Sequence, residues 1–262
     1  MIHMAGSKVI SLDIGGTNTR AALVKNGRVL KYFKSPTPKT KENFLKNVAE
    51  MINLVLDKDV KTIGVGCPGP LTKGVILNPP NLPLKNFNLE KFIKNKFGKK
   101  VVIENDAKCV ALAELKLGCK RNNFVILTLG TGIGGGIIID NKLYAGSHGY
   151  SGEISGIILD KGKSFEDLWK EKKLQIQELF EKKDFKELEK ISRYLGQGIA
   201  SLINVFDPEV VILMGGVREV GKPFLDMIKR HAKNYVLLPS IPDIKWSKLD
   251  HPGLLGASLL VK

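Results

Sequence analysis

Two segments of the chain follow one pattern, in which an apolar strand enters a glycine turn and a second apolar strand leaves it. The first segment covers residues 8–25 and the second covers residues 124–143. Glycine has no Cβ, so the backbone can bend tightly at such a turn and approach a bound group closely. Because one of these units opens each half of the chain, the sequence predicts a duplicated α/β architecture.

The remaining segments alternate between strand and helix patterns. Asn26 and Gly27 separate two apolar runs, which is a strong signal for a β-hairpin, and a second turn is expected at Asp140 and Asn141. From Thr40 the apolar residues recur on one helical face, and another helix is expected between Asn88, its N-cap, and Gly98. Further strands are expected near residues 62–71, 101–106 and 209–217, and further helices near 107–118, 164–206, 221–234 and 252–262.

The composition limits the class of protein. The chain has 262 residues, of which 43% are hydrophobic, and this is enough for a packed core without disulfides or metals. The three cysteines, Cys67, Cys109 and Cys119, show no C-x-x-C spacing and indicate neither a secreted disulfide framework nor a thiolate zinc site. The sequence has no signal-like apolar core and no run of about 18 apolar residues, so we expect a cytoplasmic protein without a membrane partner.

The formal net charge of +15 raises the question of nucleic-acid binding, because basic domains gain affinity by releasing counterions from phosphates. The lysines are scattered, however, and they alternate with acidic residues, most clearly in residues 172–190. Interleaved charges of this kind are typical of a solvated helix face. We therefore expect no nucleic-acid partner.

The first glycine turn follows a strand that ends at Asp13. Gly15 and Gly16 let the backbone approach a ligand, and the Thr17 hydroxyl and neighbouring amides can donate hydrogen bonds to phosphate oxygens. Asp13 would lie beside that phosphate and hold Mg²⁺ through water, because Mg²⁺ keeps much of its hydration shell. The alternative is an ordinary hairpin turn with a hydrogen-bonded aspartate.

The second turn, at Gly130, Thr131 and Gly132, is a candidate anion-binding concavity. It lacks the Lys and Ser or Thr that end a P-loop, and no helix follows it, so it is neither a Walker nor a Rossmann motif. Gly215 and Gly216 follow a buried strand, where a flat adenine or ribose can lie against the backbone. The alternatives are a closely packed glycine hairpin and an ordinary strand-to-helix turn.

Asn105 and Asp106 stand at the end of the strand that begins at Val101. Phosphoryl transfer needs a carboxylate that accepts the proton of the attacking hydroxyl, while a metal and hydrogen-bond donors hold the phosphates in line. Asp106 suits the role of catalytic base. Its alternative role is to cap the helix expected from Ala107, and the two roles are compatible.

Six segments stand out along the chain, in the order LDIGGTNTR, GVGCPGPL, NPPNLP, ENDAKCVALAE, TLGTGIGGGIIIDNKLYAGSHGYSGEISG and FDPEVVILMGG. In this order they resemble segments of the ROK family of sugar kinases and related repressors, within the superfamily of hexokinase, actin and the heat-shock chaperone ATPases. Each string is weak alone, but six in the family's order are specific, and the resemblance covers nearly the whole chain.

The resemblance implies a two-domain α/β fold of the actin-like ATPase (ribonuclease H-like) type, with the active site in the interdomain cleft. It implies a small N-terminal domain of residues 1–106 plus 249–262 and a large C-terminal domain of residues 107–248. The implied activity is that of an ATP:hexose phosphotransferase, which uses ATP and Mg²⁺ and acts on a glucose-like sugar or an N-acetylhexosamine. A homodimer is compatible with the resemblance.

The same resemblance assigns roles to individual residues. Asp106 is the catalytic base, and the sugar is contacted by Asn81, Asn105, Glu153 and Glu166. The remaining candidates bind the nucleotide and its Mg²⁺: Asp13, Gly15, Gly16, Thr17, Gly130, Thr131 and Gly132 at the phosphates, and Gly215 and Gly216 near adenosine.

The chain departs from the family where relatives bind structural zinc. Relatives carry a histidine three residues after the glutamate that corresponds to Glu153, and it joins cysteines of a C-x-C-G-x-x-G-C-x-E segment. Here that position is Gly156, and the later segment DKGKSFEDLW has no cysteine, so no zinc is expected. The last glutamate of that segment corresponds to Glu166. Because the histidine also contacts sugar in relatives, the identity of the sugar stays open; His148 is a candidate substitute, although a lone loop histidine more often faces solvent.

Two other functions stay open at this point. A sugar-responsive ROK-type regulator would carry a helix-turn-helix ahead of the first strand, but only seven residues precede Lys8. A sugar-independent actin-like ATPase fits the fold, yet it leaves polar residues suited to a polyol, such as Asn81 and Glu153, without a role. The phosphoryl donor is also open, with polyphosphate as the alternative to ATP.

Overall fold

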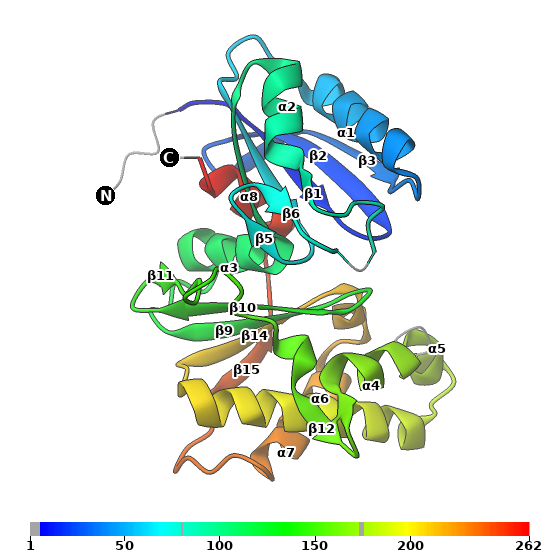
Figure 1. Cartoon of the computed structure of the whole chain (residues 1–262). Helices are drawn as coiled ribbons and strands as arrows, with labels where there is room; N and C mark the ends of the chain where they lie inside the picture. Colours follow the sequence, from blue (N-terminus) through cyan, green and yellow to red (C-terminus); the bar gives the residue numbers. More distant parts are fainter. Residues whose placement is uncertain (1–5, 80, 173–175, 262) are drawn as a thin grey trace. The chain divides into compact units, whose positions relative to one another are not determined.

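Two five-stranded sheets form the framework of the computed structural model, which describes residues 6–79, 81–172 and 176–261 (Figure 1). Pro80 of the NPPNLP segment, the first five residues and the last residue of the expected closing helix lie outside the described residues, as do the side chains of Lys172 and Gln177.

The chain divides into two compact units. Unit 1 comprises the described parts of Met1–Lys120, Ala145–Ser151 and Leu249–Lys262, and unit 2 comprises the described parts of Arg121–Tyr144 and Gly152–Lys248. Unit 1 extends beyond the expected boundary at residue 106, because helix α3 (Asp106–Leu117) packs against helix α8 (Pro252–Leu259).

The sheet of unit 1 has the strand order β3-β2-β1-β4-β8. β1 (Val9–Ile14) pairs antiparallel with β2 (Asn18–Lys25), which pairs antiparallel with β3 (Arg28–Pro36). On its other side β1 pairs parallel with β4 (Thr62–Cys67), which pairs parallel with β8 (Lys100–Asn105). The carboxyl ends of β1, β4 and β8 therefore meet at one edge of this sheet.

The sheet of unit 2 repeats this plan in the order β11-β10-β9-β14-β15. Antiparallel pairing joins its first three strands, and parallel pairing joins β9 to β14 and β14 to β15. The strands are β9 (Phe124–Leu129), β10 (Ile133–Ile139), β11 (Lys142–Leu143), β14 (Val210–Met214) and β15 (Asp243–Trp246). The two sheets have the same order and direction of strands, which confirms the expected duplicated α/β architecture.

Both expected tight hairpins are confirmed. Asn26 and Gly27 have φ values of 51° and 71°, and Asp140 and Asn141 have φ values of 50° and 60°. Positive φ at both central residues is what a two-residue turn of type I′ requires, and Asn, Asp and Gly are the residues that adopt it most easily. These turns fix the register of β2 with β3 and of β10 with β11.

The helices of unit 1 bury apolar faces. In α1 (Lys41–Val55) the buried residues include Phe44, Val48 and Ile52, as the helical period predicts. α2 (Leu89–Phe97) begins with the Asn88 side chain accepting the Lys91 amide at 2.7 Å and ends at Gly98 in the left-handed conformation. α8 packs tightly on its neighbours, since a Cβ on Gly64 of β4 would overlap the backbone carbonyl of Ala257.

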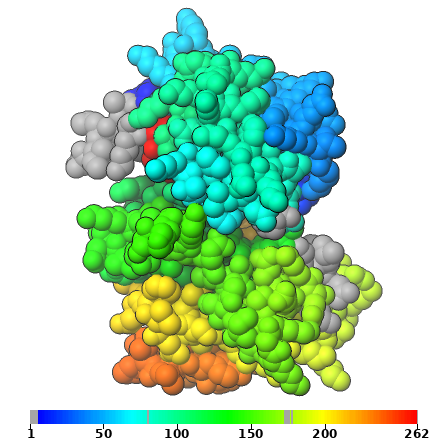
Figure 2. All heavy atoms as spheres, viewed as in Figure 1, coloured from blue at the N-terminus to red at the C-terminus, as the bar shows by residue number. Residues whose placement is uncertain are grey.

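Unit 2 has four α-helices among the residues described. They are α4 (Phe165–Lys172), α5 (Ile176–Glu181), α6 (Phe185–Phe206) and α7 (Lys222–Lys233). α6 packs against α7 and buries Leu188, Leu195 and Ile203 in the core. Figure 2 shows the outer residues of α6 in yellow and of α7 in orange at the surface of this unit.

Short elements complete the two units. Among the residues that the structure describes, unit 1 has a three-stranded sheet, and unit 2 has a small hairpin and two 3₁₀ turns: β5 (Leu71–Thr72), β6 (Val75–Ile76), β7 (Phe87–Asn88), β12 (Ile158–Asp160), β13 (Lys163–Ser164), η1 (Ile154–Gly156) and η3 (Gly216–Val220). No helix within the described ranges is long and apolar enough to cross a membrane.

Candidate active site

The carboxyl edge of the unit 1 sheet gathers the acidic candidates. In the strand register Asp13 of β1 faces Gly66 of β4, which faces Glu104 of β8, and the next pair along is Cys67 with Asn105. Adjacent strands are about 4.8 Å apart, so β1 and β8 are separated by about 10 Å. Asp13, Asn105 and the following residue Asp106 therefore share one sheet edge, which is where ligands bind in open α/β sheets.

Asp106 begins helix α3 directly after β8. The start of this helix lies close to Gly66 of β4, since a Cβ on Gly66 would be only 3.6 Å from the Asp106 Cα. Burial raises the pKa of the Cys67 thiol, and the negative charges of Asp106 and Asp13 raise it further. Both carboxylates thus lie within electrostatic reach of the same buried thiol.

The helix cap next to Asp106 differs from the expectation. α3 begins at Asp106 and not at Ala107, and its N-cap is Asn105, whose Oδ1 accepts the amides of Ala107 at 3.0 Å and Lys108 at 3.2 Å. Asp106 Oδ1 also accepts the Ala107 amide, at 2.9 Å. The capping role therefore belongs mainly to Asn105, and Asp106 occupies the first turn, where the helix dipole favours a negative charge.

Asp13 is held by a cation from the neighbouring strand. Arg20 Nη1 donates to Asp13 Oδ2 at 3.0 Å. Burial raises the pKa of Asp13, while the Arg20 guanidinium, first through its charge and then through this hydrogen bond, and the charge of His251 oppose the rise. Gly253, in the first turn of α8, also lies against the carboxylate, since a Cβ there would be 2.8 Å from the Asp13 Cγ.

The Asp13 carboxylate fits a water-mediated magnesium contact. Its side chain keeps 20% of its surface exposed beside the Arg20 pair, so solvent reaches this side chain. No group of three or more His, Cys, Asp or Glu side chains that could hold a metal occurs within the described ranges. A single carboxylate suits Mg²⁺, which is usually bound by one or two carboxylates together with substrate phosphates and water.

The first glycine turn is held by side chains that sequence patterns did not single out. Thr37 Oγ1 donates to the Gly15 carbonyl at 2.7 Å, and Lys39 Nζ donates to the Gly16 carbonyl at 2.7 Å. Thr17, the next residue of the turn, is exposed. Lys39 brings a positive charge to the candidate phosphate turn, but nothing in the sequence distinguishes it from the other lysines.

Asn81 lies directly against this turn. A Cβ on Gly16 would be 2.5 Å from the Asn81 Cβ, so only glycine fits at this position. The structure thus brings together a candidate phosphate residue and a candidate sugar residue that are far apart in the sequence. Within unit 1 the sheet edge and the turn together carry Asp13, Gly15, Gly16, Thr17, Asn81, Asn105 and Asp106.

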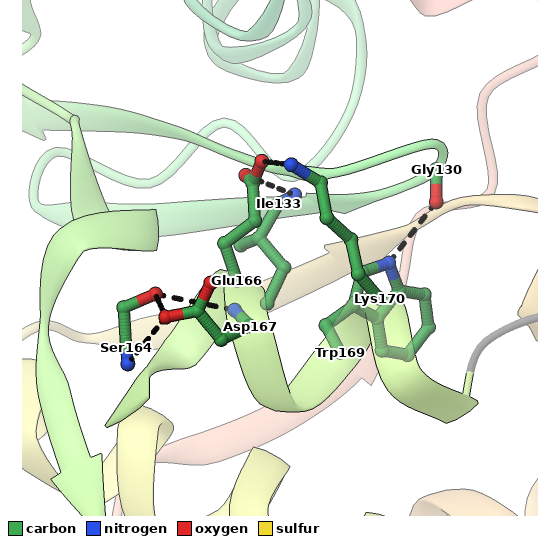
Figure 3. Close-up of polar contacts among 7 residues, drawn as sticks. All are labelled: Gly130, Ile133, Ser164, Glu166, Asp167, Trp169 and Lys170. Atoms are coloured by element: carbon green, nitrogen blue, oxygen red, sulfur yellow. Dashed lines mark hydrogen bonds and ion pairs between the residues drawn. The ribbon is translucent and has the colours of Figure 1, made fainter. Parts of the chain in front are cut away.

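The second glycine turn joins β9 to β10 and contacts α4 (Figure 3). The Gly130 amide donates to the Gly132 carbonyl at 3.0 Å, which closes the turn, and Thr131 at its tip is exposed. Glu166 of α4 accepts the Ile133 amide at 3.3 Å and forms an ion pair with Lys170. A Cβ on Gly132 would be 2.7 Å from a Glu166 carboxylate oxygen, so Glu166 lies directly on this turn.

The third glycine site adjoins the second. Gly215 follows β14 with a φ of 144°, and a Cβ there would overlap the carbonyl of Leu129, the residue before Gly130. Gly216 begins the 3₁₀ turn η3, and a Cβ there would have no neighbouring atom within 4 Å. Unit 2 therefore places its candidate adenosine and phosphate sites at the ends of the adjacent parallel strands β14 and β9.

Glu153 and His148 lie on the segment that follows β11. Glu153 is exposed and precedes η1, whose Gly156 amide donates to the Glu153 carbonyl at 3.3 Å. His148 is exposed in the part of the segment that belongs to unit 1. There the buried Lys108 of α3 donates from Nζ to the Gly149 carbonyl at 2.5 Å, a contact that ties the segment to the helix that Asp106 begins.

One protein family matches nearly the whole chain. Its model, described as the ROK family, matches residues 9–167 and 161–262. These ranges contain all the candidate site residues, from Asp13 to Gly216.

Individual relatives cover the chain equally well. The glucokinase of Thermotoga maritima is 28% identical, with 97% of this chain and 97% of that protein aligned. The N-acetylmannosamine kinase of Haemophilus influenzae is 28% identical and aligns with 97% of this chain and 95% of its own length. The crystal structure of a ROK family glucokinase from Streptomyces griseus, in complex with glucose and AMPPNP, superposes with a TM-score of 0.84 at 27% identity over 97% of this chain and 99% of that one.

Proposed function

Because this chain belongs to the ROK family and has the actin-like ATPase fold of its structural neighbours, we propose that it is an ATP-dependent sugar kinase. The observation that carries the proposal is the position of Asp106 in the first turn of α3, at the sheet edge that also carries Asp13. A general base and a magnesium-binding carboxylate at one strand edge form the arrangement that phosphoryl transfer to a hydroxyl requires.

Asp106 is the catalytic base in this proposal. Its carboxylate takes the proton of the sugar hydroxyl while the hydroxyl oxygen attacks the γ-phosphorus of ATP. The bond between that phosphorus and the bridging oxygen breaks, and ADP leaves. A base of this kind typically contributes a factor of about 10² to 10⁴ to the rate.

The glycine sites bind the nucleotide. Backbone amides near Gly15, Gly16, Gly130 and Gly132, with the Thr17 and Thr131 hydroxyls, donate to phosphate oxygens. Gly215 and Gly216 leave a flat surface for adenosine, which the open space beside Gly216 supports. Asp13 would hold Mg²⁺ through water, and the ion would supply positive charge that neutralises the phosphates. Lys39, bonded to the Gly16 carbonyl, adds a positive charge at this end.

The sugar is bound by polar side chains. Asn81, Asn105, Glu153 and Glu166 supply amide and carboxylate groups, which form hydrogen bonds with a polyol. The close packing of Asn81 on Gly16 supports its part, since it keeps this side chain beside the phosphate turn. The names of the relatives support a glucose-like sugar or an N-acetylhexosamine as the acceptor.

A panel assay tests the proposal. Purified protein is incubated with radiolabelled ATP, Mg²⁺ and single sugars, including glucose, mannose, fructose, N-acetylglucosamine and N-acetylmannosamine, and a parallel series replaces ATP with polyphosphate. The proposal predicts a labelled sugar phosphate from at least one sugar with ATP. ATP hydrolysis that is the same with and without every sugar would refute the kinase and favour a sugar-independent ATPase.

A further inference from the structure

Helix α4 holds the second glycine turn at both ends. On one side the indole Nε1 of Trp169 donates to the Gly130 carbonyl at 3.0 Å. On the other side the Glu166 carboxylate accepts the Ile133 amide at 3.3 Å, and Lys170, one helical turn further along, pairs with that carboxylate. Figure 3 shows these side chains projecting from α4 towards the turn.

α4 is itself a fixed element of unit 2. Ser164 and Asp167 cap its first turn reciprocally: the Asp167 carboxylate accepts the Ser164 amide at 2.9 Å and hydroxyl at 2.6 Å, while the Asp167 amide donates to the Ser164 hydroxyl at 3.1 Å. Phe165 and Trp169 are buried, and Gly198 of α6 lies so close to the Phe165 ring that it has no room for a Cβ. The helix is thus anchored independently of the turn that it contacts.

Within the turn itself the Gly130 amide donates to the Gly132 carbonyl at 3.0 Å. No atom packs where a Cβ at Gly130 would lie, within 4 Å, so side-chain packing does not hold this residue. Glycine loses more backbone freedom on folding than any other residue, so a glycine turn without support populates many conformations. Amides bind an oxyanion strongly only when they are already oriented towards it before the ligand arrives.

We propose that Trp169 is a positioning residue, which holds the Gly130–Gly132 turn in its phosphate-binding conformation through the hydrogen bond to the Gly130 carbonyl. The Glu166–Lys170 pair restrains the opposite end at Ile133. The inference rests on the proposed function, because it assigns MgATP as the ligand of this turn.

Two tryptophan variants test this role directly, since the chain has only two tryptophans. Trp169→Phe keeps the aromatic packing but removes the N–H donor. Trp246→Phe is the matched control, because the Trp246 Nε1 also donates to a glycine carbonyl in unit 2, that of Gly221 at 3.4 Å. Amide hydrogen exchange and calorimetric binding of MgATP without sugar are measured for both variants and for the wild type.

We expect exchange at residues 130–133 to be about tenfold faster in Trp169→Phe, and MgATP binding to be about three- to tenfold weaker, as for the loss of one hydrogen bond. The sugar KM should change by less than about twofold, since the turn is assigned to the donor. Trp246→Phe should leave exchange at the turn unchanged. Unchanged exchange or unchanged MgATP affinity in folded Trp169→Phe would overturn the positioning role.

Fluorescence of the Trp246→Phe protein provides a test that does not depend on the folding of Trp169→Phe. Trp169 is then the sole indole, and MgATP should alter its emission because the turn that it bonds takes up the phosphates. Emission that stays constant at saturating MgATP would overturn the inference. If MgATP binds with these effects but no sugar in the panel is phosphorylated, the proposed function fails and the role of Trp169 stands; if the wild type does not bind MgATP, both fail.

Discussion

Arg20 and Asp13 face each other as a cross-strand pair of β1 and β2, with the guanidinium Nη1 3.0 Å from the carboxylate Oδ2. The contact lies next to the first glycine turn. Burial penalises the charged carboxylate and raises its pKa, whereas the Arg20 charge and hydrogen bond favour the charged form. Arg20 therefore favours the anionic form of Asp13, which is the form that the proposed Mg²⁺ contact requires.

The variant Arg20→Met should move the acid limb of magnesium-dependent turnover to higher pH. The pKa of Asp13 already lies above its usual value of 3.8, and loss of the guanidinium removes the largest effect that opposes the rise. The ionised form is then lost at a higher pH as the solution is acidified. A pH series of kcat/KM at fixed sugar and limiting Mg²⁺ measures the limb.

Arg28→Met, which changes an exposed arginine on β3, is the control and should leave the acid limb at the wild-type pH.

The raised pKa of Asp13 also predicts how the stability of the protein changes with pH. A carboxyl whose folded pKa is raised contributes stability below its unfolded pKa and loses it as the pH rises through the folded pKa. The Arg20→Met protein should therefore lose more stability than the wild type on going from acid to neutral pH. If the acid limb of turnover lies at the same pH in the Arg20→Met and wild-type proteins, Asp13 does not control that limb.

Replacing two asparagine helix caps, one at the proposed site and one away from it, distinguishes an effect on stability from an effect on sugar binding. The Asn105 side chain caps α3 and the Asn88 side chain caps α2, so each change to Ala should cost about 1 kcal/mol of unfolding free energy. Only Asn105→Ala should also raise the KM for sugar, because only Asn105 lies at the proposed site. Urea denaturation and steady-state kinetics measure both quantities. Equal kinetic effects of the two variants would remove Asn105 from sugar binding.

Chelation of zinc should leave stability and turnover unchanged, provided that Mg²⁺ is restored. Cys67 and Cys109 are buried in unit 1, and burial holds the pKa of both thiols well above the usual range. The segment that carries cysteines in zinc-binding relatives has none here, and Gly156 replaces their histidine. Elemental analysis of the purified protein and its thermal midpoint with and without chelator check this. One zinc per chain, or a lower midpoint after chelation, would contradict it.

Local patterns were enough to predict most of the fold. The Asn26–Gly27 and Asp140–Asn141 turns, the Asn88 cap and the Gly98 stop each depend on residues within a few positions of one another. The start of α3 was misplaced by one residue, because Asn105 and Asp106 are both good N-caps and only the observed bonds to Asn105 decide between them. The boundary of unit 1 is harder to predict from local patterns, because α3 joins this unit by packing on α8, which is far along the chain.

The supporting residues of the site could not be predicted for the same reason. Thr37 and Lys39 reach the first glycine turn, and Trp169 reaches the second, by contacts that no local motif records. Glu166 was identified by resemblance as a sugar residue, and the structure adds its contact with the Ile133 amide. Such contacts depend on how distant elements pack, which a single sequence does not encode in any short pattern.

The rate of phosphoryl transfer by Asp106→Asn tests the central claim most directly. The amide keeps the shape of the side chain but cannot accept the hydroxyl proton, so single-turnover transfer from radiolabelled ATP to the preferred sugar should fall by about 10² to 10⁴. Calorimetric binding of MgATP and the unfolding midpoint should stay close to those of the wild type, because Asn105 supplies the helix cap. Transfer at more than about a tenth of the wild-type rate would contradict the assignment of Asp106 as the base.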